Sequence, residues 1–164
     1  MADGYGSNWI HAYSLDGKYL DYSFGGRGTK PGTFSTCHSI NWDTRFHQLI
    51  VSDRENHRHQ YFRTSTVPHD KPDVAYASQF AIPELQRPCN LRVAADNRTA
   101  VVPALEGPVG ILNATNALVS LVDVAGLLGA EGHKCPHDAM LLPSGDLIVA
   151  TWNPGRLSYW RRMR

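Results

Sequence analysis

Three residues that can bind a metal ion recur at nearly equal intervals along this chain. His38, Cys89 and His137 each occupy the second position of a short segment, and the segments span residues 37–42, 88–93 and 136–141. Imidazole nitrogen and thiolate sulfur are ligands of zinc, and three such ligands leave a coordination position open. The pattern predicts a metal site. The alternative is that Cys89 is a small buried apolar residue and that the two histidines only line a channel.

The elements that must carry these residues are predicted to be short β-strands. Runs of β-branched, aromatic and aliphatic residues, separated by Gly, Asp and Asn turns, are typical of antiparallel all-β proteins. The expected strands are residues 9–13, 19–24, 49–52, 59–63, 100–102, 109–112, 118–122, 147–151 and 157–160. The expected turns contain Asp16-Gly17, Asp96-Asn97, Asn113 with Asn116, and Ser144-Gly145. Residues 124–130 have a short helical pattern, which two glycines weaken.

The strands repeat in groups, and this repeat predicts a β-propeller. Each segment with His38, Cys89 or His137 precedes a turn, a hydrophobic strand, a polar loop and a further strand, with a period of about 48 to 51 residues. That length is close to one four-stranded blade, whereas a β-sandwich gives no reason for the recurrence. Inner strands of a propeller converge on its axis, so the three residues would face one channel.

We therefore expect an all-β fold of about 3.5 four-stranded blades in a single domain, residues 1–164. The expected parts are a blade remnant at 1–25, blades at 36–81 and 87–123, and a last blade at 135–163. A closed propeller has about four to eight blades, so this ring would be incomplete. Open ends expose strand edges and apolar blade faces, which soluble proteins avoid. We expect a homo-oligomer, with a dimer as the first expectation.

Composition and charge exclude several other classes of protein. Hydrophobic residues make up 42% and charged residues 19% of the chain, which is typical of a globular domain and not of a disordered one. The net charge is +1 with no basic stripe, so no nucleic-acid partner is expected. No apolar run is long enough to span a membrane, and no signal peptide or disulfide pattern is apparent. The sequence predicts a cytoplasmic location, with a peptide or small molecule as the ligand.

Four motifs, in this order, carry a resemblance to a known family. They are Asp3-Gly4-Tyr5, Cys37-His38-Ser39, Asp53-Arg54-Glu55-Asn56 and Pro136-His137-Asp138. Together they resemble the C-terminal half of the NHL-type β-propeller of peptidyl-α-hydroxyglycine α-amidating lyase and its bacterial relatives. Residues 64–132 match only as a generic blade.

The resemblance implies a zinc ion on the axis of a six-bladed ring, where a peptidyl-α-hydroxyglycine is split into a peptide amide and glyoxylate. It implies that His38 and His137 are zinc ligands, that Tyr5 and Arg54 are the catalytic tyrosine and arginine, and that Asp138 helps to hold a structural calcium ion. This agrees with the chemistry of the residues. A tyrosine can transfer protons, and a guanidinium can bind a carboxylate.

The chain also departs from the family pattern. The family's third zinc histidine and second catalytic arginine lie in blades that this sequence lacks, so one copy is not expected to form a complete lyase site. Two functions follow. The first is a non-catalytic or degenerate propeller module that self-assembles and binds metal in its channel, and the second is a zinc-dependent amidating-lyase-like enzyme. Residue by residue, Arg54 is alternatively a structural loop residue and Asp138 a backbone cap.

Overall fold

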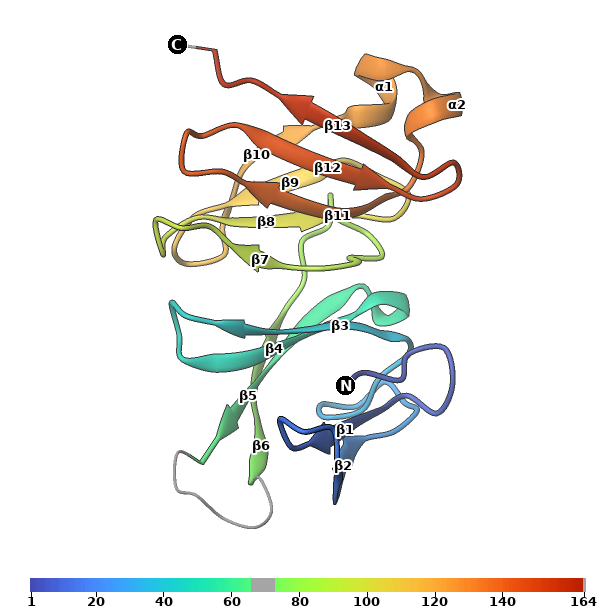
Figure 1. Ribbon diagram of the computed structural model, residues 1–164, viewed down its shortest axis with the longest axis vertical. Coiled ribbons are helices and arrows are strands. Elements are labelled where there is room, and N and C mark those ends of the chain that lie inside the picture. Colours follow the sequence, from blue (N-terminus) through green and yellow to red (C-terminus); the bar gives the residue numbers. More distant parts are fainter. Residues whose placement is uncertain (66–72, 164) are drawn as a thin grey trace.

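The computed structural model describes residues 1–65 and 73–163, which form four antiparallel β-sheets stacked one after another in chain order (Figure 1). Within each sheet, strands that are consecutive in sequence lie side by side. The all-β prediction is confirmed at this level. The number of blades in a closed ring and the division of the chain into blades remain predictions, and the expected blade at 36–81 includes residues 66–72, which lie outside the described part.

The first sheet contains β1 (Trp9–Tyr13) and β2 (Tyr19–Gly25). The second contains β3 (Cys37–Asp43), β4 (Gln48–Asp53), β5 (Arg58–Thr64) and β6 (Val74–Phe80), with a 3-10 turn, η1 (Arg54–Asn56), between β4 and β5. The third contains β7 (Arg92–Val93), β8 (Ala100–Pro103), β9 (Val109–Leu112) and β10 (Leu118–Val122). The fourth contains β11 (Pro136–Leu141), β12 (Leu147–Thr151) and β13 (Arg156–Trp160).

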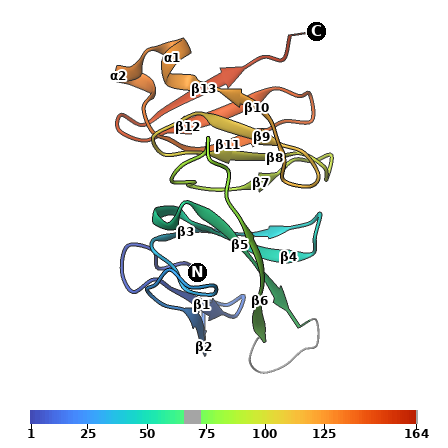
Figure 2. The same cartoon turned by 180° about the vertical axis from the view of Figure 1, so that it is seen from behind.

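Two short helices connect the third and fourth sheets. Helix α1 (Val124–Leu128) and helix α2 (Ala130–His133) lie at the end of the molecule that carries β10 and β13, as the view from behind also shows (Figure 2). Gly129 separates them with a φ of 94°. The single short helix expected at 124–130 is therefore two helices, and the second ends later than expected. No helix among the described residues is long and apolar enough to cross a membrane.

The hairpin turns use residues that tolerate a left-handed backbone. Gly17, Asn97, Asn116 and Gly145 all have positive φ values, between 53° and 86°. Glycine lacks a Cβ, and asparagine can hydrogen-bond locally, so both adopt this conformation at low cost. The predicted turns are confirmed at these positions, and they keep successive strands antiparallel.

Three hydrophobic clusters hold neighbouring sheets together. One joins the first and second sheets through Ile10, Val51 and Phe62, and another joins the second and third through residues that include Ile50 and Leu112. The third joins the last two sheets and includes Val101, Val109, Ala139, Leu147 and Val149. Along β8, Val101 faces one neighbouring sheet while Ala100 and Val102 face the other. This alternation has the two-residue period of a strand buried on both faces.

A buried polar cluster also ties the second sheet to the third. Tyr61 donates a hydrogen bond of 2.7 Å to Asp43, and Arg45 forms an ion pair of 2.7 Å with the same carboxylate. Arg45 also donates to Asn116, in the turn before β10. Burial alone would raise the pKa of Asp43, but the hydrogen bonds from Arg45 and Tyr61 outweigh it and hold that pKa below its ordinary value. Removing Arg45 or Asp43 would leave the other buried charge unpaired.

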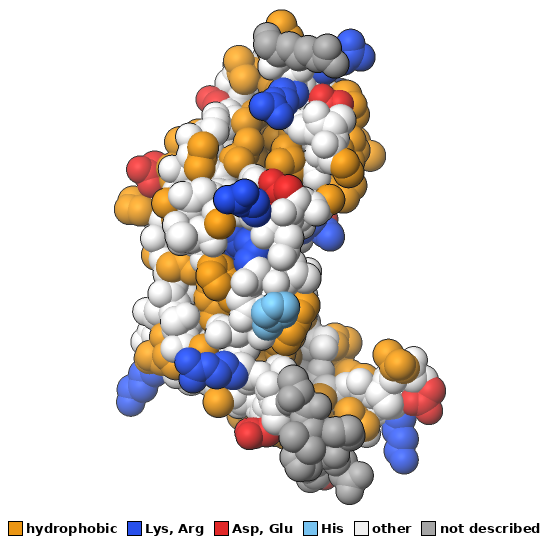
Figure 3. All heavy atoms as spheres, turned by 90° about the vertical axis from the view of Figure 1, so that its left-hand side faces the viewer, with side chains coloured by type: hydrophobic (Ala, Val, Ile, Leu, Met, Phe, Trp, Pro, Cys, Tyr) orange, Lys and Arg blue, Asp and Glu red, His pale blue; other side chains and the backbone are white. Residues whose placement is uncertain are grey.

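On the face shown in Figure 3, lysine and arginine side chains are scattered among hydrophobic and acidic ones. The described part of this face carries no continuous basic stripe.

The pH dependence of stability is expected to contain a contribution from His59. This side chain is 3% exposed, and its ring stacks on Phe80 at a centroid distance of 5.0 Å. Burial lowers the pKa of His59 to about 3. The unfolded chain, in which the histidine pKa is about 6.5, therefore takes up a proton that the folded chain does not. The contribution is fully present above about pH 6.5 and falls as the pH falls, by at most about 1.4 kcal/mol per pH unit.

Urea unfolding at about pH 7 and about pH 5 measures this effect. His59→Gln should reduce the difference in unfolding free energy between the two conditions, whereas His47→Asn, at an exposed turn histidine, should leave the difference unchanged. Equal pH dependence in the wild type and His59→Gln would contradict the assignment.

Candidate metal centre

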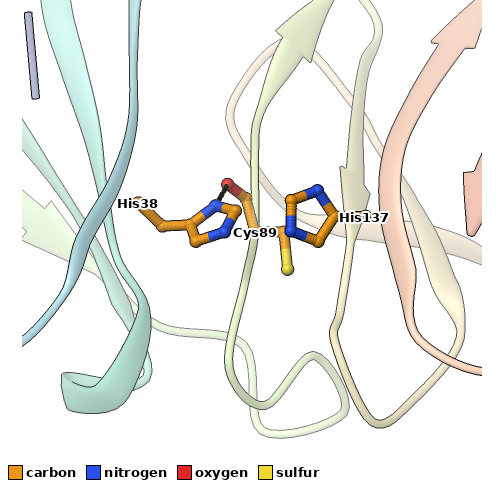
Figure 4. Close-up of side chains that lie close together, drawn as sticks. All are labelled: His38, Cys89 and His137. Atoms are coloured by element: carbon orange, nitrogen blue, oxygen red, sulfur yellow. Dashed lines mark hydrogen bonds between the residues drawn. The ribbon is translucent and has the colours of Figure 1, made fainter. Parts of the chain in front are cut away.

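The three recurring residues meet in one place. His38 lies on β3, Cys89 lies just before β7, and His137 lies on β11, so each comes from a different sheet. Their ligand atoms all lie within 4.8 Å of one another. In Figure 4 the two imidazole rings point toward each other from opposite sides, with Cys89 between them. The rings are 4.6 Å apart between centroids.

The same local backbone conformation positions these residues in three sheets. In each sheet the residue two positions before His38, Cys89 or His137 has a left-handed backbone, although it is not glycine. The three residues are Thr36, Arg87 and Cys135, with φ values of 58°, 54° and 57°. The carbonyl of each accepts a hydrogen bond of 3.0 Å from the amide of Arg54, Leu105 or Trp152, respectively. A left-handed conformation is costly for a residue with a Cβ, so its recurrence marks a shared structural requirement.

An irregularity in strand pairing follows each left-handed residue. On β3, Cys37 pairs with Asp53 and Ser39 with Ser52, so His38 is an extra residue between two consecutive partners. Such a bulge changes the direction of a side chain. It therefore turns His38 out of the regular alternation of the strand.

The other two sheets repeat this arrangement. On β11, Pro136 pairs with Thr151 and Asp138 with Ala150, so His137 is the extra residue. In the third sheet, Pro88 bridges Ala104 and Arg92 pairs with Val101, so the segment that contains Cys89 also has one residue more than its partner strand. His38, Cys89 and His137 therefore occupy equivalent backbone positions in their sheets.

One hydrogen bond determines which nitrogen of His38 is available. His38 Nδ1 lies 2.7 Å from the carbonyl oxygen of Cys89. A carbonyl oxygen only accepts, so Nδ1 carries the hydrogen and Nε2 presents a lone pair. Metal-bound histidines characteristically donate their second N–H to such a partner.

The electrostatics of the cluster keep all three groups neutral. Burial lowers the pKa of His38, although the hydrogen bond to the Cys89 carbonyl partly opposes this effect. Burial and then the positive charge of Arg54 lower the pKa of His137. Burial raises the pKa of the Cys89 thiol to about 12, and the charges of Arg54 and Arg87 reduce the rise. Two neutral imidazoles are ready to bind a cation, whereas the thiol must lose its proton when it binds one.

The structure brings Tyr5 and Arg54 together beside this cluster. Arg54 Nη1 donates a hydrogen bond of 2.9 Å to the Tyr5 hydroxyl, and the guanidinium lies over the tyrosine ring at 5.3 Å. The Tyr5 ring meets His38 edge-on, with 5.9 Å between centroids. Arg54 is buried, whereas Tyr5 is 79% exposed, so the tyrosine lies at the open side of the cluster.

The position before Tyr5 has room only for glycine. A Cβ at this position would lie 2.5 Å from the carbonyl oxygen of Cys37. The turn is held from the other side by Asp3, whose carboxylate accepts hydrogen bonds from the amide and hydroxyl of Ser7. The Asp3-Gly4-Tyr5 motif therefore packs directly against the strand that carries His38.

Sequence reasoning assigned no role to three charged residues near the site. Arg54 donates to Glu55 at 2.9 Å, and Arg87 forms an ion pair of 2.8 Å with the same carboxylate. Arg87 also pairs with Glu106. Arg87 lies two positions before Cys89, at the place equivalent to Thr36 and Cys135, so alignment of the three segments was the signal that could have revealed it.

The expected calcium ligand, Asp138, already has a cationic partner. Arg92 donates to both of its carboxylate oxygens, at 2.8 and 2.6 Å, and Asn90 donates at 2.8 Å. Burial would raise the pKa of Asp138, but the hydrogen bonds from Arg92 and Asn90 hold it below its ordinary value. A calcium ion on this carboxylate would have to displace a guanidinium, so the residues described here do not fit a calcium site as they stand.

Comparisons with known proteins agree with parts of this description. A stretch of 69 residues, 40% of this chain, is 39% identical to peptidyl-glycine alpha-amidating monooxygenase of Mus musculus. The corresponding protein of Rattus norvegicus is 38% identical over the same length. The matched stretch spans 7% of each relative. No family model matches the chain.

A solved structure resembles the whole chain in its fold. The structure described as streptogramin B lyase superposes with a TM-score of 0.58 at 12% identity, over 99% of this chain and 53% of its own. At this identity the similarity shows only a propeller-like all-β fold. The chain corresponds to about half of that structure.

Proposed function

We propose that the chain carries a metal-dependent lyase site of the amidating type, which splits a peptidyl-α-hydroxyglycine into a peptide amide and glyoxylate. In this proposal His38 and His137 hold a zinc ion and Tyr5 and Arg54 act on the substrate. The observation that carries it is the 2.9 Å hydrogen bond between Tyr5 and Arg54 beside His38. Residues far apart in the sequence thus meet at the histidine pair in one chain. The partial similarity to peptidyl-glycine alpha-amidating monooxygenase supports a link to peptide amidation.

Each residue has a distinct task in this proposal. Arg54 uses one N–H for Tyr5 and one for Glu55, and a guanidinium has five. The remaining donors would bind the substrate carboxylate in a fork. The Tyr5 hydroxyl, exposed at the open side, would relay a proton: its oxygen would accept the proton of the substrate hydroxyl while its own proton passes to the amide nitrogen. The C–N bond breaks in the same step, and the substrate C–O bond becomes the carbonyl of glyoxylate. When bound, zinc would act as a Lewis acid toward the substrate hydroxyl oxygen.

A specific observation also favours a non-catalytic module. Glu55 forms ion pairs with both Arg54 and Arg87, which reduces the positive charge available to an anionic substrate. In this second candidate function the metal, if bound, only links the three sheets, and the propeller serves as a binding or assembly scaffold. Propellers host many unrelated functions, so the fold itself does not favour either candidate.

Release of glyoxylate from an α-hydroxyglycine peptide distinguishes the two functions. We expect zinc-loaded wild-type protein to release it, and Tyr5→Phe to lower kcat/KM by about 10²–10⁴-fold, because proton transfer by a positioned side chain contributes that much. Tyr13→Phe, at a tyrosine of β1 in contact with Tyr19, should retain the wild-type rate. Zinc-loaded wild type that releases no glyoxylate would establish the non-catalytic module instead.

We also propose that a second copy of this chain packs against the end sheets. Two observations support this. Large apolar side chains are exposed on the first and last sheets, among them Trp9, Tyr13, Leu157 and Tyr159, at 40%, 44%, 76% and 58%. The chain also matches only about half of a solved propeller-like structure, so two copies would supply the equivalent of one.

The mass of the assembly in solution tests the second copy. Light scattering after gel filtration is expected to give twice the mass of the 18.2 kDa chain. Leu157→Lys should shift the protein toward the monomer because it places a charge in the apolar face. A wild-type mass equal to one chain would contradict the proposal.

A further inference from the structure

We propose that Cys89 is the third protein ligand of the metal site, bound as a thiolate, so that one chain provides a His/Cys/His set from three successive sheets. The inference rests on the proposed function for the presence of a metal ion at the two histidines. The inference adds a ligand to the proposed function, because the resemblance assigns none to the sheet that carries Cys89.

The distances suit a common ion. The ligand atoms of His38, Cys89 and His137 lie within 4.8 Å of one another. Zinc binds nitrogen at about 2.0–2.1 Å and sulfur at about 2.3 Å in a tetrahedron, which separates the ligand atoms by about 3.4–3.6 Å. Binding of one ion would require these atoms to move closer by no more than about 1.4 Å.

The main chain presents Cys89 in the same way as the two histidines. A left-handed residue lies two positions before each of the three, and each lies in a segment with one residue more than its partner strand. The left-handed residue alone does not mark a ligand, because Asn8, with a φ of 63°, lies two positions before the buried Ile10 of the first sheet. The extra residue sets the three segments apart, since Ile10 pairs regularly with Phe24. Cys89 therefore leaves the backbone at a position equivalent to those of the two histidines.

Cys89 also differs from a cysteine of the core. Both are buried, and each sulfur lies 3.9 Å from a backbone carbonyl, of Trp9 for Cys37 and of Arg87 for Cys89. Cys37, however, packs in the hydrophobic cluster between the first two sheets. Cys89 is a member of none of the three clusters formed by the described residues. Its sulfur instead faces the imidazoles of His38 and His137.

The carbonyl and the side chain of Cys89 act on the same site. The carbonyl accepts from His38 Nδ1 and so leaves Nε2 free for an ion. The sulfur would then bind that ion directly. A thiolate with two imidazoles favours zinc or cobalt over magnesium or calcium, which prefer oxygen ligands.

Absorption of the cobalt(II)-loaded protein tests the thiolate directly, because a sulfur–cobalt bond gives an intense near-ultraviolet charge-transfer band that imidazole alone does not give. We expect one cobalt per chain and this band in the wild type. The band should persist in Cys37→Ala and Cys135→Ala and disappear in Cys89→Ser and Cys89→Ala. Loss of a mere hydrogen-bond partner of a ligand costs 10–100-fold in metal affinity, so zinc affinity should fall at least about 100-fold in Cys89→Ser.

Folding of each variant is checked by circular dichroism, and Cys89→His provides a second readout. It should restore zinc binding without restoring the charge-transfer band. Cobalt bound to the wild type without the band, or a band that persists in folded Cys89→Ser, would overturn the thiolate ligand while leaving a metal at the histidines. A wild-type protein that binds neither zinc nor cobalt would overturn both the ligand and the proposed function.

Discussion

The hydrogen bond from His38 Nδ1 to the carbonyl of Cys89 is the interaction on which the candidate site depends. At 2.7 Å it crosses from the second sheet to the third, and it fixes both the orientation and the tautomer of the imidazole. The same three sheets are also linked by Asn41, Asn90 and Asp138, which are hydrogen-bonded in series. Hydrophobic clusters press the sheets together without direction, whereas these polar contacts set how the segments that carry them lie against one another.

The backbone conformation that presents His38, Cys89 and His137 is local and repeated. A left-handed residue and a strand bulge cost free energy in each of three sheets, and hydrogen bonds to the freed carbonyls offset part of that cost. Strained backbone of this kind is concentrated where side chains must point in an unusual direction. Here it directs His38, Cys89 and His137 to one point, with Tyr5 and Arg54 at its open side.

Most of the fold could be predicted from the sequence, because strands, turns and the three recurring segments have local signatures. The turns at Gly17, Asn97, Asn116 and Gly145 illustrate this. The recurrence of His38, Cys89 and His137 at the second position of three similar segments is a further example. Long-range partners could not be predicted. Glu55 and Arg87 are 32 residues apart, and the partnership of Arg92 with Asp138 spans 46. Such ion pairs depend on how sheets pack. The calcium expected at Asp138 came from resemblance, and no local signal showed that Arg92 would occupy the carboxylate.

The central claim is that His38, Cys89 and His137 together hold one metal ion. X-ray absorption at the zinc edge, on protein loaded with one equivalent of zinc, tests it most directly because it reports the elements bound to the ion. The account predicts one sulfur at about 2.3 Å and two imidazole nitrogens at about 2.0–2.1 Å. A spectrum with only nitrogen and oxygen neighbours, or more than one sulfur, would contradict it.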